Sequence, residues 1–109
     1  MNENKESIAL TEAVYYILLS LYQPMHGYGI MQNVLHLSEG RVNLAAGTLY
    51  GAISTLLEKG WIHGLPGETN SRRKEYEITA NGKNAVRYEI ARLKELVQNG
   101  EQVERGSEQ

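Results

Sequence analysis

The sequence predicts a mainly α-helical chain with a small β-hairpin, on three observations. Apolar residues recur at helical spacing in four segments, at about 8–22, 26–37, 44–59 and 80–99. Between the third and fourth segments the pattern changes to short alternating runs around a cluster of turn residues. The chain has 109 residues, of which 41% are hydrophobic, and this is the size and composition of one globular domain.

The first predicted helix, residues 8–22, is apolar on more than one face. One stripe has helical spacing and is expected in the core: Leu10, Val14, Ile17, Leu18 and Leu21. Large side chains also occupy the other faces: Tyr15, Tyr16, Leu19 and Tyr22. A helix of this kind must be buried on more than one side. The second apolar face therefore suggests a subunit interface. Pro24 is expected to end the helix.

The second and third predicted helices, 26–37 and 44–59, are joined by a short connection. Gly40 is available as a left-handed cap after the second helix, and Asn43 is a candidate N-cap for the third. Gly60 is expected to close the third helix. Its core stripe has helical spacing: Leu49, Ile53, Leu56 and Leu57. Two helices connected in this way have the spacing of a helix-turn-helix motif.

A hairpin is predicted after the third helix. Residues 61–65 and 72–79 are the two strand candidates, and residues 66–71 are a run of turn formers. A two-stranded hairpin is stable only when it packs against other elements. Three helices followed by such a hairpin form a winged helix-turn-helix, which we assign to residues 8–79 after a polar N-terminal segment, residues 1–7.

The last predicted helix, residues 80–99, has an apolar face that no later part of the sequence can cover. Val86, Ile90, Leu93 and Val97 share this face. A small domain with surplus apolar helix surface usually completes its core by pairing with a second copy. We therefore expect a C-terminal dimerisation helix. Residues 100–109 are polar and Glu-rich, and they are expected to be a disordered tail.

Several function classes are excluded by composition. The chain contains no Cys, so disulfides, thiolate catalysis and Cys-based zinc sites are absent, and the three His residues fall on different predicted elements. There is no Asp, no arrangement that activates a nucleophile and no phosphate-binding loop, so neither an enzyme nor a cofactor is expected. No apolar run approaches the roughly 20 residues of a membrane span, and no signal-peptide pattern is present. A cytoplasmic location without a membrane partner is expected.

Three motifs in order resemble the PadR (phenolic acid decarboxylase regulator) family of winged-helix regulators. The first motif opens the second helix and reads His26-Gly27-Tyr28-Gly29-Ile30. The second lies in the third helix and reads Gly47-Thr48-Leu49-Tyr50-Gly51-Ala52-Ile53, followed by Leu56-Leu57-Glu58-Lys59-Gly60-Trp61-Ile62. The third follows the hairpin turn and consists of Arg73-Lys74-Glu75-Tyr76-Glu77-Ile78-Thr79 and Gly82. The single C-terminal helix is similar to the compact subgroup. Ala45-Ala46 departs from the Ser-Pro often found there, and Glu75 places a negative charge near the hairpin.

The resemblance implies a homodimeric repressor that binds double-stranded DNA and is released by a small-molecule effector. Such a dimer would read inverted-repeat half-sites about 34 Å apart. The third helix shows small residues opposite its core stripe, which lets its backbone sit deep in a major groove. The candidate DNA contacts are Tyr28, Ala45, Thr48, Tyr50, Ala52, Lys59, Arg72, Arg73 and Lys74.

Some relatives of this kind bind small aromatic molecules between subunits, near the first and last helices. The candidates for the dimer interface or a ligand pocket are Tyr15, Tyr16, Leu19, Tyr22, Tyr88, Ile90, Leu93 and Val97. Two alternatives stay open. The sequence pI of 5.9 suits a winged-helix module for protein–protein contact without DNA affinity, since residues 8–99 carry nine Lys and Arg against eight Glu. A protein that sequesters drug-like ligands is the other.

Overall fold

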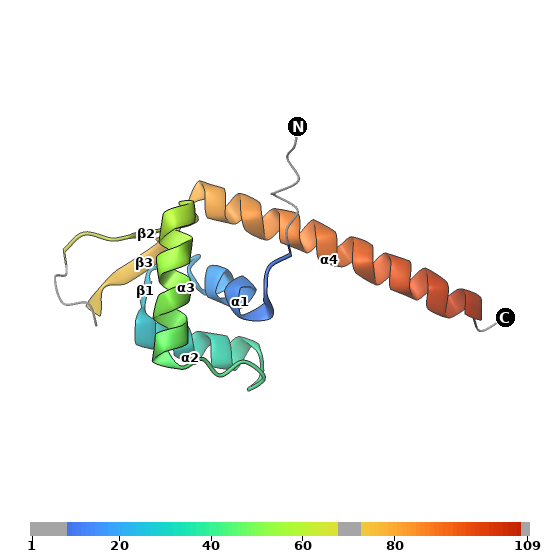
Figure 1. Ribbon diagram of the computed structural model, residues 1–109, viewed down its shortest axis with the longest axis horizontal. Helices are drawn as coiled ribbons and strands as arrows, with labels where there is room; N and C mark the ends of the chain where they lie inside the picture. Colours follow the sequence, from blue (N-terminus) through green and yellow to red (C-terminus); the bar gives the residue numbers. More distant parts are fainter. Residues whose placement is uncertain (1–8, 68–72, 108–109) are drawn as a thin grey trace.

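The computed structural model describes residues 9–67 and 73–107, which form four helices and three strands (Figure 1). In chain order these are α1 (Glu12–Ser20), β1 (Met25–His26), α2 (Gly27–Leu37), α3 (Ala46–Lys59), β2 (Ile62–Gly64), β3 (Glu75–Ile78) and α4 (Ala80–Ser107). Helices α1, α2 and α3 pack together, the small sheet lies beside α3, and α4 runs across α1 and extends far beyond the rest of the molecule (Figure 1). The predicted mainly helical fold class is confirmed.

The sheet has one strand more than the predicted hairpin. Its order is β1-β3-β2, and all pairs are antiparallel. Met25 pairs with Tyr76, so the chain just before α2 forms the third strand. A strand of two residues is too short to show alternation in the sequence, which is why the pattern predicted only two strands. Strand β3 therefore has neighbours on both sides. The start of α2 is fixed beside the hairpin of β2 and β3, which we call the wing.

Side-chain and glycine caps decide where the helices begin and end. Helix α1 begins at Glu12, later than predicted, because the Thr11 hydroxyl accepts a hydrogen bond from the Val14 N–H at 3.1 Å. His26 caps α2 in the same way, with Nδ1 accepting from the Gly29 N–H at 3.2 Å. Gly60 ends α3 as predicted, with φ of 74°.

One predicted cap is wrong, and the left-handed cap predicted at Gly40 is confirmed. Asn43 does not cap α3; Ala45 occupies the N-cap position without a side-chain hydrogen bond. After α2, Glu39 takes the first left-handed position (φ 53°), and Gly40 follows it with φ of 86°. The Gly40 N–H then bonds the Leu35 carbonyl at 2.9 Å, which is the pattern of a Schellman cap.

The core lies where the four helices meet the sheet. Its buried members are Ile17, Leu18, Leu21, Ile30, Val34, Leu49, Ile53, Leu56, Ile62, Tyr76, Ile78 and Val86. Each predicted helix contributes apolar residues to this core, but α4 does so only through Val86, with Ile90 packed against it, whereas Leu93 and Val97 are exposed. Leu57 is the exception in α3, because it lies at the edge of the stripe and is 40% exposed. The burial of Leu49, Ile53 and Leu56 fixes the rotation of α3 about its axis.

Helix α4 is longer than predicted. It continues to Ser107, so the expectation of a disordered tail is wrong for residues 100–107. The Glu, Gln and Arg residues of this segment are good helix formers. Arg105 lies in the last turn, where a cation interacts favourably with the helix dipole. Near its start, Gly82 lets α4 approach the Trp61 carbonyl, because an added Cβ would clash with that oxygen.

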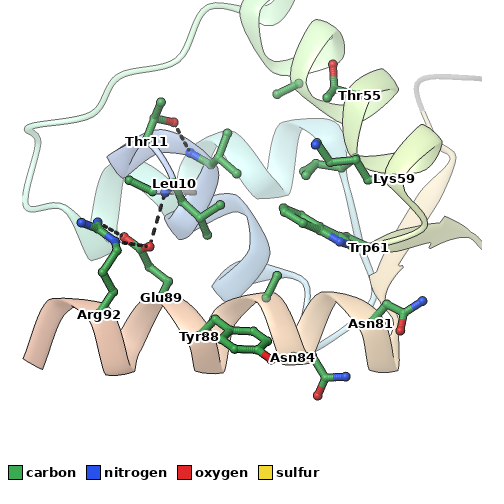
Figure 2. Close-up of a pocket in the computed structure, with 15 residues that line it drawn as sticks. Leu10, Thr11, Thr55, Lys59, Trp61, Asn81, Asn84, Tyr88, Glu89 and Arg92 are labelled. Atoms are coloured by element: carbon green, nitrogen blue, oxygen red, sulfur yellow. Dashed lines mark hydrogen bonds and ion pairs between the residues drawn. The ribbon is translucent and has the colours of Figure 1, made fainter. Parts of the chain in front are cut away.

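A buried carboxylate fastens the N-terminal segment to α4. Glu89 is 5% exposed, and its two oxygens accept hydrogen bonds from Arg92 at 2.9 and 2.6 Å (Figure 2). The Leu10 N–H donates to the same carboxylate at 3.3 Å. The hydrogen bonds from Arg92 lower the pKa of Glu89; burial opposes this shift, and the bond from Leu10 adds to it. The ionised form is thus the stable one in the folded chain.

We predict that Glu89 makes the protein sensitive to acid. Because the pKa of Glu89 is lower in the folded state, its contribution to stability is present above the unfolded pKa, about 4.5, and is lost as the pH falls through the folded pKa. Glu89→Gln should lower the free energy of unfolding by roughly 1–3 kcal/mol at neutral pH. It should also flatten the decline of that free energy below about pH 4.5, measured by urea denaturation. An unchanged pH profile would contradict the role given to this carboxylate.

Candidate nucleic-acid interface

The face of α3 that points away from the core consists mostly of small and polar residues. Its exposed members are Gly47, Gly51, Ser54 and Glu58, and Thr48 and Thr55 are exposed at its edge, where Thr55 also lines a hollow between α3 and α4. An added Cβ would meet nothing within 4 Å at Gly47 or Gly51, so the surface along this face is open. The role of Thr48 as a DNA contact stays a prediction. A helix backbone covered by such small residues can approach another surface closely.

Ala45 is exposed at the start of α3, but Ala52 does not belong to the outward face. Ala52 is half-buried, packs against the core and lines a hollow between α3 and α4. The reason is the helical period: burying Leu49 and Ile53 turns Ala52 toward α4. Composition alone could not decide this, because Ala is equally compatible with both faces.

The start of α2 lies beside α3 through one close contact. The hydroxyl of Tyr50 lies against Gly27, where an added Cβ would clash with that oxygen and lie 2.7 Å from Cζ. Tyr28, in the first turn of α2, is 63% exposed. The two tyrosines thus border the N-terminal end of α2, where helix N–H groups favour a negative partner. The Gly27–Tyr50 contact was not predicted, although both residues belong to the PadR-like motifs.

The described part of the wing carries the cations Arg73 and Lys74. Arg73 is exposed just before β3, and the stem of Lys74 lies over Gly64 of β2. Arg73 and Glu75 line a shallow hollow of about 420 Å³ together with His26 and the residues Leu65 and Pro66. Glu75 therefore faces the same hollow as Arg73, as its position in the sequence suggested. Arg72 lies outside the described residues.

Lys59, predicted as a phosphate contact, lies on the side of α3 that faces α4. Its ammonium lies 5.1 Å from the centre of the Trp61 ring, which is a cation–π distance. Lys59 and Trp61 line the same hollow as Ala52, about 790 Å³ in volume, with Asn81, Asn84 and Tyr88 of α4 (Figure 2). No local sequence pattern predicts this hollow, since its residues come from three separate stretches of the chain, within 9–14, 52–61 and 81–92.

The aromatic side chains predicted for an interface or ligand pocket are divided between two sides of α4. Tyr88 lines the hollow with Trp61, whereas Tyr15 lines another, of about 620 Å³, with Ile90, Leu93 and Val97. Tyr16 and Leu19 are half-buried against the core of their own chain. Tyr22 is 42% exposed, with the Lys83 ammonium 5.3 Å from its ring centre. Within one chain these tyrosines therefore form no single pocket.

The family assignment rests on a match that spans most of the winged-helix region. The model described as the transcriptional regulator PadR-like family matches residues 16–88. The chain belongs to the PadR-like family. Members of this family are transcriptional regulators and not enzymes, which agrees with the expectation from composition. No curated protein sequence matches the chain.

Solved structures of similar fold include PadR-like regulators. A PadR family transcriptional regulator from Eggerthella lenta is 24% identical, with a TM-score of 0.67, over 83% of this chain and 79% of that one. A transcriptional regulator from Clostridium thermocellum is 23% identical, with a TM-score of 0.61, over 86% and 87%. A conserved protein described as a potential transcriptional factor is 26% identical, with a TM-score of 0.67, over 88% and 86%. These similarities support the winged-helix fold.

Two further observations concern metal binding and membrane-spanning helices in this PadR-like chain. Among the described residues, no group of three or more His, Cys, Asp or Glu is arranged to hold a metal ion. Two of the His side chains have structural contacts: His26 caps α2, and His63 lies 3.3 Å from Glu77 across the sheet. In the same part of the chain, no helix is both long and apolar enough to cross a membrane.

Proposed function

We propose that this PadR-like regulator binds operator DNA as a homodimer, with the outward face of α3 in the major groove and the wing on the adjacent backbone. The observation that carries this proposal is the exposed row of small residues on α3, Gly47, Thr48 and Gly51, together with the exposed cation Arg73 of the wing. Small residues allow close approach to base edges, and Thr48 can bond a base or a phosphate. Contacts from Tyr28, Tyr50, Arg73 and Lys74 to phosphates would fix the register.

Helix α4 supports the homodimer. Beyond the body of the molecule it carries exposed apolar side chains: Leu93, Leu96, Val97 and Val103. Leu93 and Val97 continue the side of α4 on which Val86 lies in the core, and Leu96 and Val103 lie to one side of them. A second copy offers the same surface to this overhang, and a twofold axis makes the two contacts equivalent. The two α3 helices would then meet half-sites about 34 Å apart.

Repression and its release complete the proposal. A dimer bound at a promoter would block polymerase, and an effector that changes the angle between the subunits would release it. The hollow formed by Tyr15 with Ile90, Leu93 and Val97 is open along α4 and would be closed by a second subunit. A small aromatic molecule is the ligand that such a lining suits.

A protein-contact module without DNA affinity is the second candidate, and the charge distribution favours it. The net charge is −2, Glu58 lies on the outward face of α3, and Glu75 lies beside Arg73 in the wing. The two candidates differ in what the α3 face binds, so a DNA-binding measurement separates them.

We predict that the purified chain binds the intergenic DNA upstream of its own gene in the presence of excess unrelated DNA. Affinity should fall steeply as salt rises, because phosphate contacts release counterions. Electrophoretic mobility shifts at two salt concentrations measure both properties. If that fragment fails, selection of bound fragments from the whole genome serves as the second measurement. Absence of any preferred fragment would support the protein-contact module instead.

We predict that Val97→Glu prevents dimerisation and weakens operator binding. The substitution places a charge among the exposed apolar residues of α4, whose burial against a second copy would then leave it unpaired. Ala91→Glu is the matched control, since Ala91 is exposed on the other side of the same helix. Sedimentation equilibrium should show a monomer for Val97→Glu and a dimer for the control. Dimers in both variants would place the interface elsewhere.

A further inference from the structure

One acidic side chain stands in the row of small residues on α3. Gly47, Gly51, Ser54 and Glu58 follow one another at spacings of four, three and four, so they share one face of the helix, opposite Leu49, Ile53 and Leu56. Glu58 is exposed and is the longest side chain of the four. A groove that admits the three small residues closely would also receive this carboxylate.

The charge of Glu58 is not neutralised within the described part of the chain. No hydrogen bond or ion pair there involves its carboxylate, and its neighbours at three and four residues along the chain, Ser54, Thr55, Trp61 and Ile62, carry no positive charge. The ammonium of the adjacent Lys59 lies over the Trp61 ring, on the side of the helix that faces α4. The carboxylate is therefore available to an external hydrogen-bond donor.

On DNA, only certain donors suit a carboxylate. It can accept hydrogen bonds but donate none, and phosphate oxygens repel it. In the major groove, cytosine presents its N4 amino group as a donor, whereas guanine presents acceptors. Adenine presents an amino group beside the acceptor N7, which would face the second carboxylate oxygen unfavourably.

We propose that Glu58 is a specificity-determining residue that accepts a hydrogen bond from cytosine N4 in each half-site. The inference rests on the proposed DNA binding by α3 and adds a defined base preference to it. It also accounts for an acidic residue on a surface that approaches DNA: the carboxylate penalises sequences that offer no donor, which is discrimination against wrong sites.

The test is selection of bound sequences from a random DNA pool, with the wild type and Glu58→Gln. The wild type should favour cytosine at one position of each half-site by about tenfold. A glutamine amide both donates and accepts, and it pairs with adenine N6 and N7, so the preference in Glu58→Gln should move to adenine at that position. Glu95→Gln, an exposed charge removal on α4, is the control and should keep the cytosine.

Each other outcome has a definite meaning. If Glu58→Gln selects an unchanged motif, with or without a uniform gain in affinity, the carboxylate has at most a general electrostatic effect and the inference is wrong. If the wild type selects no motif at all, the proposed DNA-binding function fails, and the inference fails with it. Thermal melting of the variant should match the wild type, because Glu58 is exposed and makes no bond within the described residues.

Discussion

The burial of Leu49, Ile53 and Leu56 is the constraint on which the rest of the structure depends. These three side chains leave α3 one rotation about its axis, because any other would expose them or bury a polar face. That rotation turns Gly47, Gly51 and Glu58 outward. It also turns Ala52 and Lys59 toward α4, where they line a hollow with Trp61. The same packing therefore decides both the surface that we propose for DNA and the cavity beside it.

Helix α4 combines two environments along one axis. Its first half is fastened to the body by Val86 in the core and by Glu89, whose carboxylate joins Arg92 to the Leu10 backbone. Its second half extends past the body with apolar residues exposed (Figure 1). In the proposed dimer, this continuous helix would carry a change of subunit angle to α1 and β3, on which its first half packs.

Much of the fold could be predicted because apolar periodicity marks each helix that contributes to the core. Gly60 and His26 stand where the chain ends or begins a helix, and both positions agree with the structure. Strand β1 could not be found, because two residues show no period and their pairing partner is Tyr76, far along the chain. The end of α4 was missed because residues 100–107 have no apolar stripe that requires a helix.

The candidate site was predicted less completely, for a related reason. Thr48 and Arg73 are exposed, and their role as DNA contacts stays a prediction. Ala52 and Lys59 turn toward α4 instead, because small or long flexible residues fit several directions and only the packed core selects one. The separation of Tyr15 from Tyr88 also depends on how α4 crosses α1, which local sequence patterns do not encode.

The most direct test of the central claim is the effect of Gly51→Leu on stability and on DNA binding, measured on the same sample. Gly51 lies in mid-helix with open space around it, so Leu should fold without a clash and stabilise α3 by roughly 1 kcal/mol. The same side chain would hold α3 away from the floor of the major groove. We expect an unchanged or higher melting temperature together with loss of operator binding. A stable variant that binds the operator as tightly as the wild type would contradict the account.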